Sequence, residues 1–324
     1  MKAIVFDRYG TADQLLLRDV PEPTPAEDEV LIKVHAVSIN DWDWGILQGI
    51  PYLNRMTFGL RRPRRHILGS DVAGRVEAVG RKVERLRPGD EVLGDLSGRW
   101  GGFAEYVCAG EDALVRKPTG MTFVEAAAIP QAATLALQGL RDRGRIERGQ
   151  RILINGAGGG VGTFGVQLAK LDEAEVTGVD SPDKLDLLRS IGFDHVVDYT
   201  REDFTRGAER YDLILDVKTN RPLRDYLRVL NPGGAYVTVG GASGSLIRAL
   251  LLKPLAPLAG GKRVAVVSLK LNKDLDYLCE LHAAGKLRPV IDGPYELGEA
   301  PGAMRHFAEG KHQGKVVIRV DGGA

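Results

Sequence analysis

The sequence predicts an α/β protein in which a doubly wound, parallel-sheet domain is inserted into a β-rich domain. Three observations lead to this prediction. The first part of the chain is rich in short strand patterns, the middle alternates strands with helices, and the last part returns to short strands with one helix. Alternation of strands and helices at short spacing is typical of βαβ units, whose parallel sheet is covered by helices.

Short strands dominate the first part of the chain. In Glu29–Ala36, apolar residues alternate with polar ones, which predicts a half-buried strand. Proline and glycine in Arg87–Asp90 predict a turn, since proline sets φ and glycine allows a positive φ. Further strand patterns lie at 72–79, 91–94 and 101–107.

The pattern changes near Thr122. Thr122 and Glu125 have the spacing of a capping box, and an alanine-rich run up to Ile129 predicts a helix. We therefore expect a β-rich domain in residues 1–121 and 263–324, and the inserted domain in residues 122–262. The strands of the inserted domain are predicted near 151–155, 175–179, 195–197, 212–217 and 235–240.

The composition is that of an ordinary globular protein of two-domain size, with 324 residues, 44% of them hydrophobic and 27% charged. A net charge of +1 predicts no general attraction to nucleic acid or to an anionic membrane. The apolar segments are too short or too interrupted to insert into a bilayer, and Met1–Asp7 reads as a strand rather than a signal peptide. Two cysteines suit the reducing cytoplasm, so we expect a cytoplasmic protein.

The most informative segment is Arg151–Lys170. A short apolar run meets a glycine-rich turn, and a helical pattern follows, which is the context that a dinucleotide fingerprint requires. Small residues let the backbone approach a pyrophosphate, and the N-terminus of the helix stabilises its charge. The predicted cofactor-binding residues of this turn are Ala157, Gly158, Gly159, Gly160 and Val161.

An acidic residue ends the next strand pattern. Asp180 follows the glycines by about 20 residues, where a carboxylate accepts hydrogen bonds from the adenosine ribose and repels a 2′-phosphate. This position favours NADH. Ser181 and Lys184 are close enough in the sequence to bind a 2′-phosphate, so NADPH stays open. The alternative is that Asp180 merely caps the helix that follows.

Seven segments occur in an order typical of one superfamily: 38–44, 67–74, 89–92, 101–106, 129–134, 156–162 and 314–318. Through them nearly the whole chain resembles the medium-chain dehydrogenase/reductase superfamily, and within it the zinc-free quinone oxidoreductase group. The resemblance implies a GroES-like catalytic domain with an inserted Rossmann domain. Ala157, Gly159 and Gly162 occupy the three fingerprint positions, and alanine in the first favours the quinone reductases.

Zinc-dependent members of this superfamily carry a Gly-His-Glu motif and a cysteine ligand before it. In this chain the motif's slot reads Gly69-Ser70-Asp71, the cysteine slot falls near Asn40 and the third ligand slot near Gln131. Two cysteines cannot form the four-cysteine structural lobe, and the six histidines lie far apart in the sequence. Because a catalytic zinc needs three protein ligands, we expect no metal site.

Without zinc, the chemistry implied by the resemblance is hydride transfer from a nicotinamide to a quinone or to the β-carbon of an α,β-unsaturated carbonyl. The developing enolate oxygen needs hydrogen-bond donors and then a proton. By resemblance, Asn40 is the first candidate donor, and Gln131 and Thr134 line the nicotinamide pocket. Tyr52 is a candidate proton donor, with a core or rim tyrosine as the alternative.

The resemblance also implies further cofactor contacts. Tyr199 matches a tyrosine near the adenosine end and Lys315 a lysine near the cofactor, while Val239, Gly240 and Gly241 match the strand end that meets the nicotinamide carboxamide. Close relatives often have a neutral residue in place of Asp180 and commonly use NADPH. The expected cofactor is therefore NAD(P)H, with NADH modestly favoured by Asp180.

Two other functions stay open: an alcohol dehydrogenase acting on simple alcohols, and a non-catalytic NAD(P)H-binding or redox-sensing protein. The missing zinc ligands argue against the first, and the polar groups of Asn40, Gln131 and Thr134 argue against the second. The basic cluster Arg61–Arg65 is predicted to be a solvated loop, with an anion-binding role as the alternative. A homodimer is expected from the resemblance alone.

Overall fold

The computed structural model describes residues 1–324 except 51, 53, 65, 241–259 and 321–324. The chain divides into two units: the first unit is Met1–Gln131 with Leu271–Ala324, and the second unit is Ala132–Lys270. Both boundaries differ from those expected after residues 121 and 262. The capped helix α3 (Phe123–Ala128) packs against the sheet of the first unit, and the strand β13 (Arg263–Val266) completes the sheet of the second.

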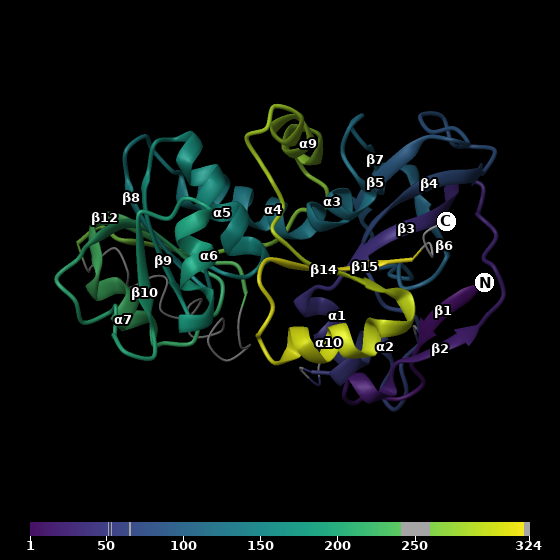
Figure 1. Ribbon diagram of the computed structural model, residues 1–324, viewed down its shortest axis with the longest axis horizontal. Helices are drawn as coiled ribbons and strands as arrows, with labels where there is room; N and C mark the ends of the chain where they lie inside the picture. The colour runs from purple at the N-terminus through teal and green to yellow at the C-terminus, as the bar shows by residue number, and fades with distance from the viewer. Residues whose placement is uncertain (51, 53, 65, 241–259, 321–324) are drawn as a thin grey trace. The chain divides into compact units, whose positions relative to one another are not determined.

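The first unit is built on a seven-stranded sheet with the order β14-β15-β3-β4-β5-β7, in which β6 also pairs with β3 (Figure 1). The strands of this sheet are β3 (Glu29–Ser38), β4 (Asp71–Val79), β5 (Glu91–Asp95), β6 (Tyr106–Gly110), β7 (Val115–Arg116), β14 (Ile291–Glu296) and β15 (Lys315–Arg319). The strands β1 (Lys2–Val5) and β2 (Leu16–Asp19) form a separate antiparallel pair. The other helices of this unit are α1 (Asp41–Gln48), α2 (Asn54–Phe58), α9 (Leu275–Ala283) and α10 (Ala300–Ala308).

The last strand of the chain lies beside one of the first. β15 pairs antiparallel with β3, with Val317 opposite Ser38, and the Ile39 N–H donates to the Val316 carbonyl at 2.9 Å. This register brings Lys315, the first residue of β15, next to the residues that follow β3. The predicted return of the chain to its first domain is thus confirmed.

The strand predicted at 101–107 is wrong, because β6 begins only at Tyr106. Trp100 and Gly101 have φ values of 55° and 109°, and two consecutive positive φ values turn the chain instead of extending it. The predicted turn at Arg87–Asp90 is confirmed: Gly89 has a φ of 95°, and the Asp90 N–H donates to the Arg87 carbonyl at 3.1 Å.

The second unit contains a six-stranded sheet with the order β10-β9-β8-β11-β12-β13, all of whose pairings are parallel. In chain order this is 3-2-1-4-5-6, the strand order of the Rossmann fold. The fold class predicted from the sequence is confirmed. Its further strands are β8 (Arg151–Asn155), β9 (Glu175–Asp180), β10 (His195–Asp198), β11 (Tyr211–Asp216) and β12 (Leu230–Thr238).

Helices cover both faces of this sheet. The backbone of α5 (Gly160–Leu171) approaches Ile154 so closely that a Cβ on Gly165 would lie 3.1 Å from it. The neighbouring residue Leu153 packs in a cluster with Tyr226 of α7 (Leu223–Arg228). Successive side chains of a strand point to opposite faces, so α5 and α7 lie on opposite sides. A shorter helix, α6 (Leu185–Ser190), packs near β10.

The strand order reverses between β8 and β11. In an open parallel sheet, ligands bind outside the carboxyl ends of the strands at such a reversal. The glycine-rich turn predicted to bind the dinucleotide follows β8 directly, so the topology places it at this point.

The close approach of α5 to the turn predicts a difference between two helical glycines. A Cβ on Gly162 would lie 2.4 Å from the Ala157 carbonyl oxygen, whereas a Cβ on Gly302 of α10 would meet nothing within 4 Å. We expect Gly162→Ala to lower the free energy of unfolding by about 1–3 kcal/mol. Gly302→Ala should leave it unchanged or raise it by up to about 1 kcal/mol. Urea unfolding of both variants checks this, and equal midpoints would contradict the packing described.

Candidate functional site

The turn between β8 and α5 is shaped to bring its backbone close to a ligand. Gly156 has a φ of 85°, and a Cβ on Gly158 would lie 2.7 Å from the Lys184 side chain. Gly159 is the N-cap of α5 and offers no side-chain hydrogen bond to it. The first N–H groups of α5, those of Gly160 and Val161, thus have no side-chain cap and fit a pyrophosphate.

Asp180, at the end of β9, is bonded to this turn. Its carboxylate accepts the Gly158 N–H at 2.7 Å and the Ser181 N–H at 2.9 Å, and the Lys184 ammonium lies 3.9 Å away, with both side chains buried. The carboxylate therefore binds the glycine turn rather than capping the following helix, whose N-cap is Ser181. The buried Lys184 ammonium offsets part of the negative charge of the Asp180 carboxylate.

Tyr199 lies at the same edge of the sheet. Its N–H donates to the Asp180 carbonyl at 3.3 Å, and its side chain is 45% exposed. The structure thus brings together the residues predicted for the adenosine end: Asp180, Ser181, Lys184 and Tyr199.

A buried carboxylate that the sequence analysis missed organises the other half of this edge. Asp216, the last residue of β11, accepts from the Asn155 side-chain amide at 2.8 Å, the Tyr236 hydroxyl at 2.6 Å and the Thr219 N–H at 2.9 Å. The signal that points to it is a lone acidic residue directly after the apolar run Leu213–Leu215.

The end of β12 is tied to the same loop. The Val239 N–H donates to the Asp216 carbonyl at 3.1 Å, and the hydroxyls of Thr219 and Thr238 lie 2.5 Å and 2.8 Å from the Gly240 carbonyl oxygen. Val239 and Gly240 are therefore held at the carboxyl edge of the sheet, where the nicotinamide end was expected. Gly241 lies outside the described residues.

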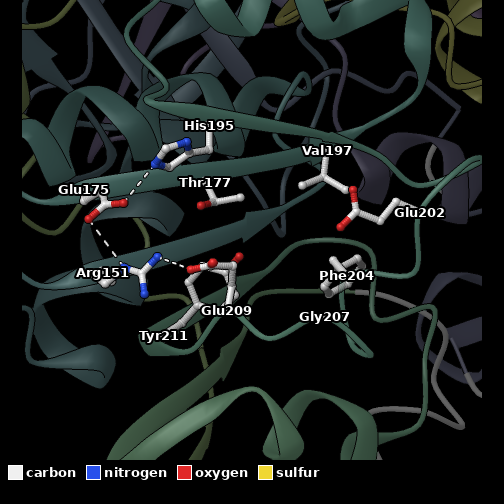
Figure 2. Close-up of a pocket in the computed structure, with 10 residues that line it drawn as sticks. All are labelled: Arg151, Glu175, Thr177, His195, Val197, Glu202, Phe204, Gly207, Glu209 and Tyr211. Atoms are coloured by element: carbon white, nitrogen blue, oxygen red, sulfur yellow. Dashed lines mark hydrogen bonds and ion pairs between the residues drawn. The ribbon is translucent and has the colours of Figure 1, made fainter.

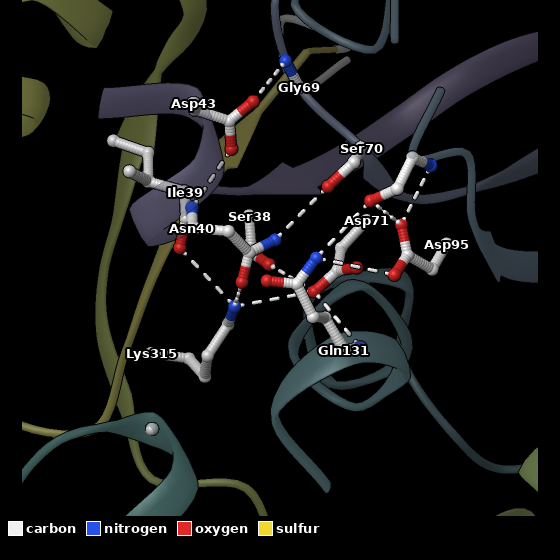
Figure 3. A network of polar contacts seen from close by, with 12 residues as sticks. Ser38, Ile39, Asn40, Asp43, Gly69, Ser70, Asp71, Asp95, Gln131 and Lys315 are labelled. Atoms are coloured by element: carbon white, nitrogen blue, oxygen red, sulfur yellow. Dashed lines mark hydrogen bonds and ion pairs between the residues drawn. The ribbon is translucent and has the colours of Figure 1, made fainter. Parts of the chain in front are cut away.

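A second polar network lies in the first unit, around Asn40 (Figure 3). Asn40 is the N-cap of α1, and its backbone N–H donates to the Asp43 carboxylate at 2.9 Å. In its side chain, Oδ1 accepts from the Lys315 ammonium at 2.5 Å and Nδ2 donates to the Ser70 hydroxyl at 3.3 Å. Asn40 is buried, so this network determines the orientation of its carboxamide.

Lys315 is buried, with 4% of its side chain exposed. Its ammonium donates to the Ile39 carbonyl at 3.2 Å, to Asn40 Oδ1 at 2.5 Å and to Asp71 Oδ2 at 3.3 Å. An ammonium has three N–H donors, and all three are used inside the first unit. A direct hydrogen bond to the cofactor would have to replace one of these three, and the proximity of Lys315 to the cofactor stays a prediction.

Asp71, the partner of Lys315, opens strand β4 and is fully buried. Its Oδ2 also accepts from the Ser38 hydroxyl at 3.2 Å and the Gln131 N–H at 3.3 Å, while Oδ1 has no hydrogen-bond partner. Burial raises the pKa of Asp71 to about 6, although the Lys315 ammonium acts in the opposite direction. The sequence signal that identifies Asp71 is a carboxylate directly before the uncharged run Val72–Gly74 at the start of a strand.

Gln131 and Thr134 lie three residues apart on α4 (Pro130–Leu137). The Gln131 side-chain amide donates to Asp95 at 3.2 Å and to Ser97 at 3.3 Å, so Gln131 joins the network of the first unit. Thr134 belongs to the second unit, and its buried hydroxyl has no hydrogen-bond partner. Such a group costs stability unless a ligand satisfies it.

Tyr52 takes no part in either network. Its side chain is 72% exposed, and the Arg55 guanidinium lies 4.7 Å from its ring centre and 4.5 Å from that of Tyr9. This exposure excludes a core tyrosine, while the roles of proton donor and rim residue stay predictions. In the basic cluster, Arg61, Arg62 and Arg64 are exposed, as expected for a solvated loop; residue 65 is not among those described.

A cavity of about 390 Å³ lies at the other end of the second sheet (Figure 2). Arg151, Glu175, His195 and Tyr211, each the first residue of its strand, line it. Its polar groups satisfy one another: His195 contacts Glu175 at 2.8 Å, and Arg151 pairs with Glu175 at 3.4 Å and with Glu209. This cavity is at the amino ends of the strands and is separate from the glycine turn.

The matches to known proteins agree with these features. Residues 26–119 match the alcohol dehydrogenase GroES-like domain family, and residues 191–318 match a family described as zinc-binding dehydrogenase. A chloroplastic quinone oxidoreductase of Triphysaria versicolor is 32% identical over 98% of both chains. The chain belongs to the quinone oxidoreductase group of the medium-chain dehydrogenase/reductase superfamily.

Two further relatives support this membership. The 2-methylene-furan-3-one reductase of Solanum lycopersicum is 33% identical, over 98% of this chain and 79% of the relative. The solved structure of the quinone oxidoreductase from Coxiella burnetii superposes with a TM-score of 0.88 at 30% identity, over 99% of both chains. Membership of this superfamily implies an NAD(P)H-dependent oxidoreductase.

The ligand slots of the zinc-dependent superfamily members are occupied here by hydrogen-bonded polar residues. Asn40 and Ser70 bond to each other, and Gln131 bonds to Asp95. Within the described ranges, no group of three or more His, Cys, Asp or Glu side chains is arranged to hold a metal ion. Nor does any helix among those residues have the length and apolar character needed to cross a membrane.

Asp43 predicts a pH dependence of stability in this member of the superfamily. Its carboxylate accepts the Asn40 and Gly69 N–H groups, both at 2.9 Å, yet burial raises its pKa to about 7. In the unfolded chain an aspartate titrates near pH ~4. Because the folded pKa is the higher one, the stability that this group contributes is complete below pH ~4 and is lost as the pH rises through about 7.

We therefore expect the thermal midpoint of the native chain to fall between pH ~5 and pH ~8. Asp43→Asn should lower the midpoint at all pH values, since one backbone N–H loses its acceptor, but should flatten this fall. Differential scanning calorimetry over the range checks it. Parallel profiles for the two proteins would exclude Asp43 as the titrating group.

Proposed function

We propose that the chain is an NAD(P)H-dependent, zinc-independent reductase of quinones or α,β-unsaturated carbonyls. The observation that carries this proposal is the Asn40 carboxamide, which is buried and held in one orientation by Lys315 and Ser70. The glycine turn and the carboxyl edge of the second sheet support the binding of NAD(P)H in this proposal.

The orientation of Asn40 follows from counting donors. Lys315 can only donate, so the Asn40 atom that faces it must be the oxygen Oδ1. Nδ2 then faces Ser70 and uses one of its two N–H groups there. A side-chain hydrogen bond from Asn40 also favours the ionised form of the buried Asp71, so in this proposal a substrate oxygen replaces one of these two acceptors of Nδ2.

A bound nicotinamide supplies the hydride. In this proposal the turn Ala157–Val161 binds the pyrophosphate, and the edge at Asp180 binds the adenosine ribose. Asn40 donates an Nδ2–H group to the carbonyl oxygen on which negative charge develops, which stabilises the transition state. Water then supplies the proton, since neither polar network presents an acidic side chain as a free donor.

The names of the relatives support this reaction class. One is called a quinone oxidoreductase and another a 2-methylene-furan-3-one reductase. The names of two relatives about one-third identical to this chain therefore include a quinone and a conjugated ketone as substrates. The alcohol dehydrogenase reading is weaker because the slots for zinc ligands hold Asn40, Ser70 and Gln131. The homodimer and the cytoplasmic location remain predictions from the sequence.

The test is oxidation of NADH and NADPH by menadione-type quinones and by small enones, with simple alcohols plus the oxidised cofactors as a comparison. We expect turnover with the first two classes and a fall in kcat of about 100-fold or more in Asn40→Ala, since one preorganised donor is lost. Cofactor binding, followed by fluorescence, should be unchanged. Asn231→Ala removes a carboxamide at the opposite end of β12 and serves as the control.

Three results would contradict the proposal. The first is turnover only with alcohols together with bound zinc. The second is cofactor binding without turnover of any acceptor, which would favour the redox-sensing alternative. The third is an equal loss of activity in Asn40→Ala and Asn231→Ala.

We propose that the preference for NADH is small, because Lys184 lies only 3.9 Å from the Asp180 carboxylate. Asp180→Asn keeps an acceptor for the Gly158 N–H and removes the charge. We expect it to raise the kcat/KM ratio of NADPH to NADH about tenfold, which corresponds to ~1.4 kcal/mol. Lys184→Met should shift the ratio the other way. Steady-state kinetics with both cofactors checks this, and an unchanged ratio in both variants would exclude this pair as the determinant.

A further inference from the structure

We propose that Lys315 is a positioning residue: its buried ammonium, whose charge is balanced by Asp71, orients and polarises the Asn40 carboxamide. In this way Lys315 supplies a positive charge to a site in which the metal-ligand positions hold no metal-binding residues. This rests on the proposed function, in which Asn40 meets the substrate oxygen. Lys315 acts through Asn40 and does not touch the substrate.

The backbone around Lys315 is held on both sides. The Lys315 N–H donates to the Val290 carbonyl at 2.8 Å, and the next residue, Val316, accepts from the Ile39 N–H at 2.9 Å. The side chain is 4% exposed. The ammonium is therefore placed by the sheet pairing of β15 with β3, unlike that of a surface lysine, which samples many rotamers.

The charge of this ammonium is balanced inside the same network. Asp71 lies 3.3 Å away and is itself held by Ser38 and Gln131. A buried ion pair needs such further hydrogen bonds to offset the cost of desolvation. Because all three N–H donors of Lys315 are used, Lys315 makes no direct hydrogen bond to a substrate, and its hydrogen-bonded link to the substrate is the amide of Asn40.

The effect on Asn40 is electrostatic. A cation 2.5 Å from Oδ1 withdraws electron density from the amide, and its Nδ2–H groups become stronger donors. Hydrogen bonds that involve an ionised group are about twice as strong as neutral ones, and networks at low dielectric polarise one another. The Nδ2–H groups of Asn40 thus gain part of the strength of a charged donor.

The position of this ammonium explains the replacement of the zinc ligands. Asn40, Ser70 and Gln131, which stand in the three ligand slots, all bond within the network that contains Lys315 and Asp71. A divalent metal polarises an unactivated carbonyl or alcohol directly. A polarised N–H is a weaker electrophile, and it suits acceptors whose carbonyl is already activated by conjugation.

The first test compares Lys315→Met with Lys117→Met. Lys117 is a matched control, because its buried ammonium lies 2.9 Å from Glu91 in the same unit. We expect Lys315→Met to lower kcat by at least about tenfold, more with enones than with the more easily reduced quinones, with KM for the cofactor unchanged. Lys117→Met should keep the native kcat. Equal kcat values in the two variants would overturn the proposal.

The second test separates positioning from stability. Lys315→Met leaves the Asp71 carboxylate buried and unpaired, which destabilises the fold, whereas Lys315→Met with Asp71→Asn restores neutrality. We expect this double variant to regain thermal stability but not activity. In an Asn40→Ala background, Lys315→Met should cause no further loss of kcat. Recovery of activity in the double variant, or the same loss with and without Asn40, would assign Lys315 a structural role only.

The third test does not depend on turnover. With 15N-asparagine labelling, the side-chain amide signal of Asn40, assigned through Asn40→Ala, should shift in Lys315→Met and not in Lys117→Met, and its protons should exchange faster with water. An unchanged signal overturns the proposed positioning. A shifted signal in a protein that reduces no quinone or enone supports the positioning and contradicts the proposed function.

Discussion

The ion pair between Lys315 and Asp71 is the interaction on which the site of the first unit depends. Lys315 comes from the last strand and Asp71 from β4, with β3 between them in the sheet. Their contact joins Ser38, Asn40 and Gln131 into one hydrogen-bonded group. If either the ammonium or the carboxylate were removed, the other charge would remain buried without its partner, which destabilises the fold. Each charge therefore requires the other, and together they hold Asn40.

The second unit uses carboxylates in a comparable way, at the carboxyl ends of its strands. Asp180 binds the backbone of the glycine turn at Gly158, and Asp216 binds the loop at Thr219 beside the end of β12. In both cases an acidic side chain at a strand end accepts backbone N–H groups and sets the course of the following loop. The edge of a Rossmann sheet that receives a dinucleotide is thereby preorganised before any ligand binds.

Local patterns allowed much of the fold to be predicted. The strand at Glu29–Ala36, the capping box at Thr122 and the strand–turn–helix around Gly158 each depend on residues close in the sequence, and each is confirmed. The strand is not half-buried as predicted, since Glu29 to Ile32 are all buried. The strand at 101–107 failed because a turn at Trp100 and Gly101 depends on backbone angles that an apolar pattern does not reveal. The boundaries near 121 and 262 failed because they depend on which sheet α3 and β13 join.

The sequence by itself determined the β-rich and doubly wound domains and the glycine turn, because these follow from the spacing of apolar and small residues. The GroES-like class followed from the resemblance of the seven segments. The sequence also determined the residue types in the three ligand slots. Only the tertiary structure decided that Lys315, far from Asn40 and Asp71 in the chain, is their partner, and that the side chain of Tyr52 is exposed. The reason is that charge pairing and burial depend on strand register between distant segments, and no local pattern specifies that register.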